Sequence, residues 1–196
     1  MKKLLLSVIC LIAVLSQANA HDKRFNFGLR MAPAISWLNI DEPGLSESGA
    51  RMKFNWGFIG AWNFYDNLSL VSGFNINSLG ANYRSDIEKY RINYTEFQVP
   101  ILFQMRTNHI GNLRLHAQIG IGQGVMLNAR DRDDNNIRSD VRNFNTAYIV
   151  AGGMEIRVLG ELSLLAQIKY NGGLTKIHRH YDMRNNFVEL AFGVLF

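Results

Sequence analysis

The sequence contains a single cysteine, Cys10, which lies in an apolar stretch near the N-terminus. If that stretch is removed on export, the remaining chain has no cysteine. This excludes a disulfide framework, a thiolate nucleophile and a cysteine metal site. Cys10 follows Ile9, where a lipoprotein signal requires a small residue, so we also exclude lipidation.

Long apolar runs are missing after residue 20. A transmembrane helix needs roughly twenty consecutive apolar residues, so a helical membrane protein is excluded. A strong excess of positive charge is missing too, because removal of Lys2 and Lys3 leaves 19 of the 21 basic residues against 16 acidic ones, and the formal net charge falls from +5 to +3. This net charge is smaller than is typical of a nucleic-acid-binding protein, so no nucleic acid partner is expected.

The first twenty residues have the pattern of an export signal. Two lysines form a positive start, residues 4–15 form an apolar core, and residues 18–20, Ala-Asn-Ala, match the small-x-small pattern that signal peptidase cleaves. The core is too short to cross a bilayer as a helix. We therefore predict a cleaved signal peptide over residues 1–20 and one mature domain over residues 21–196.

The last eleven residues, 186–196, alternate between two kinds of side chain. Because side chains on a strand point alternately to opposite faces, one face is wholly apolar and the other mixes small and charged groups. The apolar face carries Phe192, Val194 and the C-terminal Phe196. This ending resembles the closing strand of bacterial outer-membrane β-barrels, in which it is the recognition signal for the assembly machinery.

Seven further segments show a similar alternation, with one face nearly free of charge. Together the predicted strands cover residues 24–38, 51–64, 68–78, 94–106, 113–127, 144–158, 162–174 and 186–196. In lipid every backbone polar group must be paired, and a closed barrel is the sheet that leaves no edge. The sequence predicts an all-β fold, an eight-stranded antiparallel transmembrane β-barrel with up-and-down topology. A soluble lipocalin-type barrel would bury the charged face in a dry core.

The predicted connections alternate in length. Those near residues 65–67, 107–112 and 159–161 are short, whereas those near residues 39–50, 79–91, 128–143 and 175–185 are long and polar. Outer-membrane barrels have short periplasmic turns and longer extracellular loops. We therefore predict a bacterial outer-membrane location with both termini in the periplasm.

The charged residues on the inward faces are expected to form two lumenal clusters. The first contains Arg30, Lys169 and Glu189, the second contains Arg114, His116 and Glu155, and Glu96 also faces the lumen. An eight-stranded barrel is just wide enough for side chains to fill, so these charges are expected to pair and close a polar lumen. A proton path or a narrow channel is the alternative.

No assembled catalytic constellation is visible in the sequence. Catalytic carboxylates need a defined separation and access to substrate, and the inward-facing glutamates are expected to serve structural pairing instead. His178 and His180 are the best metal-like pair, but two ligands without a clear third partner are a weak zinc pattern. We expect no enzyme activity, no metal and no cofactor, with a lipid A-modifying enzyme as the alternative.

The predicted fourth strand carries Tyr94, Glu96 and Pro100 within residues 94–103. This stretch resembles the Tyr-x-Glu-x-Pro-like strand of the PorT-like outer-membrane β-barrel family of Bacteroidetes. The resemblance implies a fold and a location, and it adds an accessory role in type IX-like protein secretion as an alternative function.

The sequence as a whole is typical of a non-enzymatic envelope protein. We expect it to contribute to membrane integrity or to present its long loops to an envelope protein partner. Its other expected partners are outer-membrane lipids, lipopolysaccharide and, during biogenesis, the barrel-assembly machinery.

Overall fold

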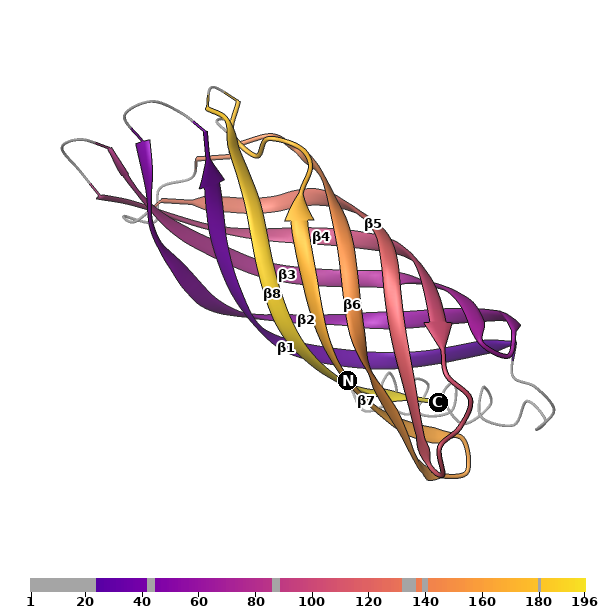
Figure 1. Cartoon of the computed structure of the whole chain (residues 1–196). Coiled ribbons are helices and arrows are strands. Elements are labelled where there is room, and N and C mark those ends of the chain that lie inside the picture. Colours follow the sequence, from indigo (N-terminus) through magenta and orange to yellow (C-terminus); the bar gives the residue numbers. More distant parts are fainter. Residues whose placement is uncertain (1–23, 42–44, 86–88, 132–136, 139–140, 180) are drawn as a thin grey trace, which may run out of the picture.

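The computed structural model describes residues 24–41, 45–85, 89–131, 137–138, 141–179 and 181–196. Within these residues eight strands form a closed barrel in which each strand pairs antiparallel with the next and β8 pairs with β1 (Figure 1). The strands are β1 (Phe25–Ile40), β2 (Leu45–Tyr65), β3 (Leu68–Ser85), β4 (Lys89–Arg106), β5 (Leu113–Arg130), β6 (Phe144–Leu159), β7 (Leu162–Gly173) and β8 (Met183–Leu195). The predicted fold class is confirmed, whereas the predicted signal peptide lies outside the described residues. None of the described residues belongs to a helix long and apolar enough to cross a membrane.

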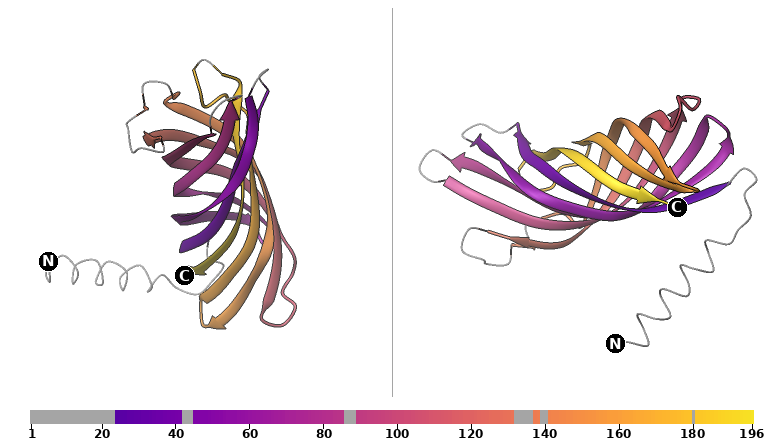
Figure 2. Two further views of the ribbon diagram at one scale, coloured as in Figure 1. Left: turned by 90° about the vertical axis from the view of Figure 1, so that its left-hand side faces the viewer. Right: turned by 90° about the horizontal axis from the view of Figure 1, so that it is seen from below.

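The first and last strands close the barrel side by side (Figure 2). Gly28 faces Leu195 in the antiparallel register. Beyond the end of β8, the backbone N–H of Phe196 donates to the oxygen of Phe27 at 2.8 Å, and the N–H of Phe27 donates to the oxygen of Phe196 at 3.0 Å. The chain therefore enters and leaves the barrel at one end, which also holds the connections 66–67, 107–112 and 160–161. We name this the turn end and the opposite end the loop end.

The strand faces agree with the alternation in the sequence. On β1, Leu29 and Met31 are exposed outward, while Ala32, Ala34 and Ser36 are buried inside. The same outward exposure of large apolar side chains recurs on every strand. Apolar surface of this extent is costly in water and suits a lipid environment, which contradicts the lipocalin-type alternative.

Three strands extend at least five residues further at the loop end than the sequence predicts. β2 begins at Leu45, β3 ends at Ser85 and β4 begins at Lys89, and these segments project beyond their neighbours in Figure 1. The predicted long loops over residues 39–50 and 79–91 are therefore wrong, because only residues 41–44 and 86–88 connect the strands there. Backbone pairing continues past the apolar band, as in the Tyr83–Tyr90 register, without the apolar alternation that marks a strand in lipid.

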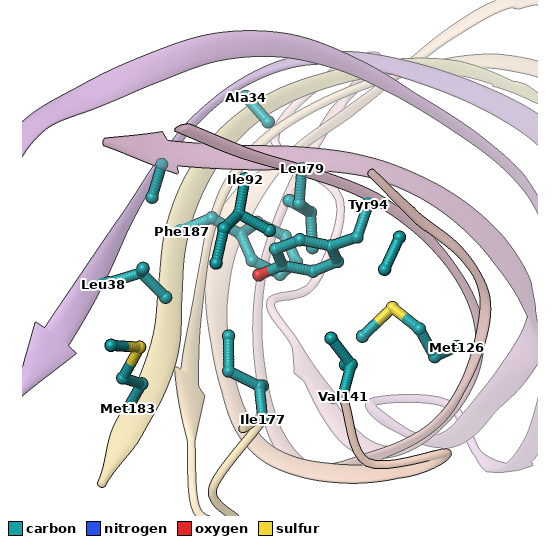
Figure 3. Packing of buried hydrophobic residues seen from close by; sticks show 12 residues of the cluster. Ala34, Leu38, Leu79, Ile92, Tyr94, Met126, Val141, Ile177, Met183 and Phe187 are labelled. Atoms are coloured by element: carbon teal, nitrogen blue, oxygen red, sulfur yellow. The ribbon is translucent and has the colours of Figure 1, made fainter. Parts of the chain in front are cut away.

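The interior changes character along the barrel, which corrects the expectation of a polar lumen. Most of the buried ionic and amide side chains occupy the middle and the turn end, while Glu96 and Asn185 lie at the level of the loop end. At the loop end the lumen is filled by a cluster of apolar side chains, which we name the apolar plug (Figure 3). The plug consists of Ala34, Leu38, Leu79, Ala81, Ile92, Tyr94, Met126, Ala129, Val141, Ile177, Met183 and Phe187.

Two of the plug residues come from connections between strands. Val141 lies between β5 and β6, and Ile177 lies between β7 and β8. The two connections bind each other, because the N–H of Arg142 donates to the oxygen of Ile177 at 2.8 Å. The N–H of Ile177 in turn donates to the oxygen of Met183 at the start of β8, also at 2.8 Å. Val141 and Ile177 are therefore held over the lumen at the loop end.

We expect Gly73→Ala to destabilise the barrel by about 1–3 kcal/mol. Gly73 has a φ of 140°, and a Cβ built there would overlap the backbone oxygen of Phe58 on β2. Gly152→Ala is the matched control, since a Cβ there meets nothing nearer than the oxygen of His116 at 3.9 Å. Urea unfolding in lipid vesicles would measure both variants, and equal midpoints would contradict the strain assigned to Gly73.

Candidate functional site

A buried ionic cluster occupies the middle of the lumen and joins five strands. Lys169 Nζ of β7 lies 2.6 Å from Glu189 Oε1 of β8, and Arg30 Nη1 of β1 pairs with the same oxygen. Asn55 Nδ2 of β2 donates to Glu189 Oε2 at 2.8 Å. Arg30 Nε donates to Asn75 Oδ1 of β3 at 2.9 Å. The structure therefore brings together Arg30, Lys169 and Glu189, as predicted from the sequence.

Strand register explains why these three side chains meet. Lys169 and Glu189 face each other directly across β7 and β8. Arg30 has Gly57 as its register partner on β2 and Gly193 on β8, so no neighbouring side chain takes the space of its guanidinium. This cluster holds two cations against one carboxylate, which makes Glu189 the residue on which its charge balance depends.

A second cluster lies nearer the turn end and is centred on Glu155. Glu155 Oε1 lies 3.8 Å from His116 Nδ1, and Glu155 Oε2 lies 4.0 Å from Arg106 Nη1. Gln104 Nε2 donates to Glu155 Oε1 at 3.4 Å, and His116 Nε2 lies 3.2 Å from Gln167 Oε1. His116 and Glu155 are thus neighbours, as expected from the sequence.

Arg114 differs from the expectation that it joins this cluster. Its backbone faces Glu155 in the register, but its guanidinium turns to the connections at the turn end. It donates to the oxygen of Thr107 at 2.8 Å, to Asn67 Oδ1 at 3.2 Å and to the backbone oxygen of Asp66. Arg106, and not Arg114, lies beside Glu155. The register pairing of Arg106 with His116 is the feature from which this position could have been predicted.

Glu96 faces the lumen, as its alternation predicts, and stands apart from both clusters. It is fully buried, and Asn145 Nδ2 of β6 donates to its Oε2 at 3.0 Å. Its Oε1 and the hydroxyl of Tyr94 have no hydrogen-bond partner among the described residues. A Cβ at Gly124 would overlap this carboxylate, so the glycine on β5 provides the space in which Glu96 lies.

The predicted metal pair cannot be assembled from the described residues. His180 lies outside them, and the ring of His178 lies 4.8 Å from that of Tyr181. Among the residues that the structure describes, no three His, Cys, Asp or Glu side chains are grouped to hold a metal ion. Of the residues in the predicted assembly signal, Phe192 and Val194 face outward and Phe196 is half-buried beside Phe27.

A pocket of about 720 Å³, which was not predicted from the sequence, opens at the turn end. We name it the basic pocket. Its lining is Arg24, Asn26, Asn63, Phe64, Tyr65, Asp66, Asn67, Arg106, Asn108, His109, Arg114, Arg157 and Glu161. Four arginines therefore face two carboxylates there. Arg106 and Arg114 flank one turn, but Arg24 and Arg157 come from distant parts of the chain, so no local pattern could have revealed the pocket.

His109 lies among the arginines of the basic pocket. Its Nε2 lies 3.2 Å from Arg157 Nη2. Partial desolvation, followed by the charges of Arg114, Arg157 and Arg106, lowers the pKa of His109 below its ordinary value, while Glu155 opposes this effect. The imidazole is therefore neutral near pH 7, and the arginines supply the positive charge.

A closed antiparallel barrel with an apolar outer face defines an outer-membrane-type β-barrel protein. Residues 15–179 match the family described as outer membrane protein beta-barrel domain, and the chain belongs to that family. This family membership places it among bacterial outer-membrane barrel proteins. No curated protein sequence matches the chain.

Solved barrels share the fold at low sequence identity. Neisserial surface protein A is 13% identical with a TM-score of 0.58, and the match covers 88% of this chain and 96% of that one. OprG from Pseudomonas aeruginosa is 9% identical with a TM-score of 0.53, covering 87% and 95%. The outer membrane protease OmpT from Escherichia coli is 8% identical with a TM-score of 0.53, covering 92% and 99%. Identities this low show a common fold and nothing about activity.

Proposed function

We propose that this chain is a non-conducting outer-membrane protein that works as an interaction protein at its two ends. The observation that carries the proposal is the filled lumen. An ion moving through the barrel would meet the Arg30–Glu189–Lys169 cluster and then the apolar plug. An eight-stranded barrel is only wide enough for side chains, and a dry apolar constriction is itself a barrier to ions.

The proposal includes no catalytic role for the lumenal carboxylates. Two cationic side chains bind Glu189. Glu155 lies beside Arg106 and His116, and Glu96 accepts a hydrogen bond from an amide. A general acid or base needs contact with a substrate, and these groups lie inside the barrel wall. If the protein were a lipid A-modifying enzyme, its overproduction would change the mass spectrum of lipid A. We expect that spectrum to be unchanged.

The orientation in the membrane is part of the proposal. Short turns face the periplasm in outer-membrane barrels, so the turn end with both chain ends would be periplasmic and the loop end would face the outside. Lipids and lipopolysaccharide would surround the outer face and the loop end. Phe192, Val194 and Phe196 would be recognised by the barrel-assembly machinery during insertion.

An accessory role in protein secretion is the second candidate, and it rests on the PorT-like resemblance. Tyr94, Glu96 and Pro100, which carry the resemblance, are all buried on the lumenal face of β4. Such residues favour a shared way of filling the barrel over a shared surface for cargo. Deletion of the gene followed by an assay of secreted cargo tests this role, and retention of cargo in the periplasm would support it.

We expect no stable single-channel conductance from the purified protein in planar lipid bilayers. The buried ionic cluster and the apolar plug are two barriers in series, so thermal motion of one does not open a path. A channel-forming porin prepared in the same detergent is the positive control, and heat-modifiable gel migration checks that the barrel is folded. Reproducible conductance steps absent from the detergent blank would contradict the proposal.

A further inference from the structure

We propose that the basic pocket at the turn end is a binding site for an acidic peptide segment of an envelope partner. This inference rests on the proposed interaction role and gives one of the two ends a ligand. The volume of the basic pocket, about 720 Å³, lies within the range of pockets that enclose ligands. A peptide on the periplasmic side would enter through the mouth formed by the turns.

The positive charge of the pocket comes from segments that meet only at the turn end. Arg24 precedes β1, Arg106 ends β4, Arg114 lies at the start of β5, and Arg157 lies near the end of β6. Guanidinium groups bind carboxylates through paired hydrogen bonds of fixed geometry. Arginines at separate points around one mouth therefore fit a ligand with more than one carboxylate.

The four arginines divide into two that organise the pocket and two that face its opening. Arg114 binds the connections on both sides, and Arg106 donates to Asn63 Oδ1 and lies beside Glu155. Arg24 and Arg157 are both exposed, and Arg157 contacts the imidazole of His109. A carboxylate can approach Arg24 and Arg157 without breaking the bonds that hold the turns.

Asparagine side chains favour a peptide over a bare anion. Asn63 donates to Asn26 at 3.2 Å, and Asn67 donates to Asn108 at 3.0 Å, and all four line the pocket. Asn26 and Asn108 are the acceptors in these two bonds, and a primary amide also carries two N–H donors, which can bind carbonyl oxygens of a peptide backbone. Arginines beside amides thus match both the side chains and the main chain of an acidic peptide.

The test uses the full-length protein in detergent micelles and a rhodamine-labelled hexapeptide of alternating glutamate and glycine. We expect a saturable rise in fluorescence anisotropy. The double variant Arg24→Gln, Arg157→Gln should weaken binding by about tenfold, since each lost charge-assisted bond is partly screened by solvent. The control double variant Arg142→Gln, Arg179→Gln removes two exposed arginines between strands at the loop end and should bind as the unchanged protein does.

Three results would overturn the inference. Equal weakening in the two double variants would mean attraction by net charge alone. Equal binding of the hexapeptide with glutamine in place of glutamate would exclude recognition of carboxylates. Displacement of the peptide by inorganic phosphate at lower concentration than by unlabelled peptide would identify a phosphate site in place of a peptide site.

His109 gives a second readout that a purely structural change would not move. Bound carboxylates offset the charges of Arg106, Arg114 and Arg157, so the pKa of His109 should rise when the peptide is added. Titration of the imidazole by NMR, with and without peptide, measures this shift, and an unchanged pKa at saturation would contradict binding beside Arg157. Conductance of the same preparation separately tests the closed lumen, so the two proposals can fail independently.

Discussion

Replacement of Glu189 by glutamine is expected to destabilise the folded barrel by about 3–5 kcal/mol, the usual cost of removing one partner from a buried ion pair. Glu189 is fully buried and is the only carboxylate in the described contacts of Arg30 and Lys169. Without it, two cations lie in the lumen with only amide partners such as Asn75. Uncompensated buried charge is costly because the lumen gives little of the solvation that water provides.

Lys169→Met is the informative control for Glu189→Gln. The methionine side chain is similar in length to that of lysine but carries no charge. In this variant Arg30 and Glu189 remain as an ion pair with no net charge. Replacing part of a buried ionic cluster by an apolar side chain is often close to neutral. We therefore expect Lys169→Met to lose less than half of the stability that Glu189→Gln loses.

Urea titration of the barrel in lipid vesicles, followed by tryptophan fluorescence and by heat-modifiable gel migration, measures both variants. Glu189→Gln should also lower the yield of folded protein in the outer membrane. If Lys169→Met proved as damaging as Glu189→Gln, packing volume would matter more than charge balance, and Glu189 would not be the residue that balances the cluster.

Ile119→Arg is expected to destabilise the barrel by about 2–4 kcal/mol, the cost of arginine on the lipid face near the bilayer midplane. Ile119 points outward from β5, with Phe103 and Val150 as its register partners on the neighbouring strands. A transmembrane strand needs roughly nine to eleven residues, which places Ile119 near the middle of the lipid. An arginine there must reach to the interface or bring water into the lipid.

Ile110→Arg is a matched control for position. Ile110 and Ile119 are the same residue type and are both 62% exposed, but Ile110 lies in the connection between β4 and β5. Arginine at residue 110 should therefore change stability by less than about 0.5 kcal/mol. Urea titration in vesicles distinguishes the two. Equal effects would show that lipid does not surround Ile119, and the membrane register would have to be revised.

The turn-end boundaries of the strands were predictable because local chemistry marks them. Asp66 and Asn67 interrupt the apolar alternation between β2 and β3, and Gly111 and Gly160 provide the positive φ angles of 62° and 55° that tight turns require. The loop-end boundaries were not predictable. Once a strand has left the lipid its two faces no longer differ in polarity, so the alternation ends while hydrogen bonding continues.

The lumenal cluster was predictable where it depends on consecutive strands. Lys169 and Glu189 lie on neighbouring strands at similar counted depth, so register alone brings them together. Arg114 shows the limit of such counting, because a long side chain can extend towards either end of the barrel. The apolar plug shows another limit, since Val141 and Ile177 lie in connections and no strand pattern assigns them to the interior.

The sequence by itself determined the barrel and the face of each residue in the alternating part of the strands, because an alternation of period two specifies strand, lipid side and lumen side together. The tertiary structure decided which charges meet. Arg24 and Arg157 lie more than a hundred residues apart, and only the closure of β8 on β1 makes a single mouth that both can line. Side-chain direction within the lumen, and with it the separation of Glu96 from the ionic clusters, likewise depends on neighbours that a linear pattern does not contain.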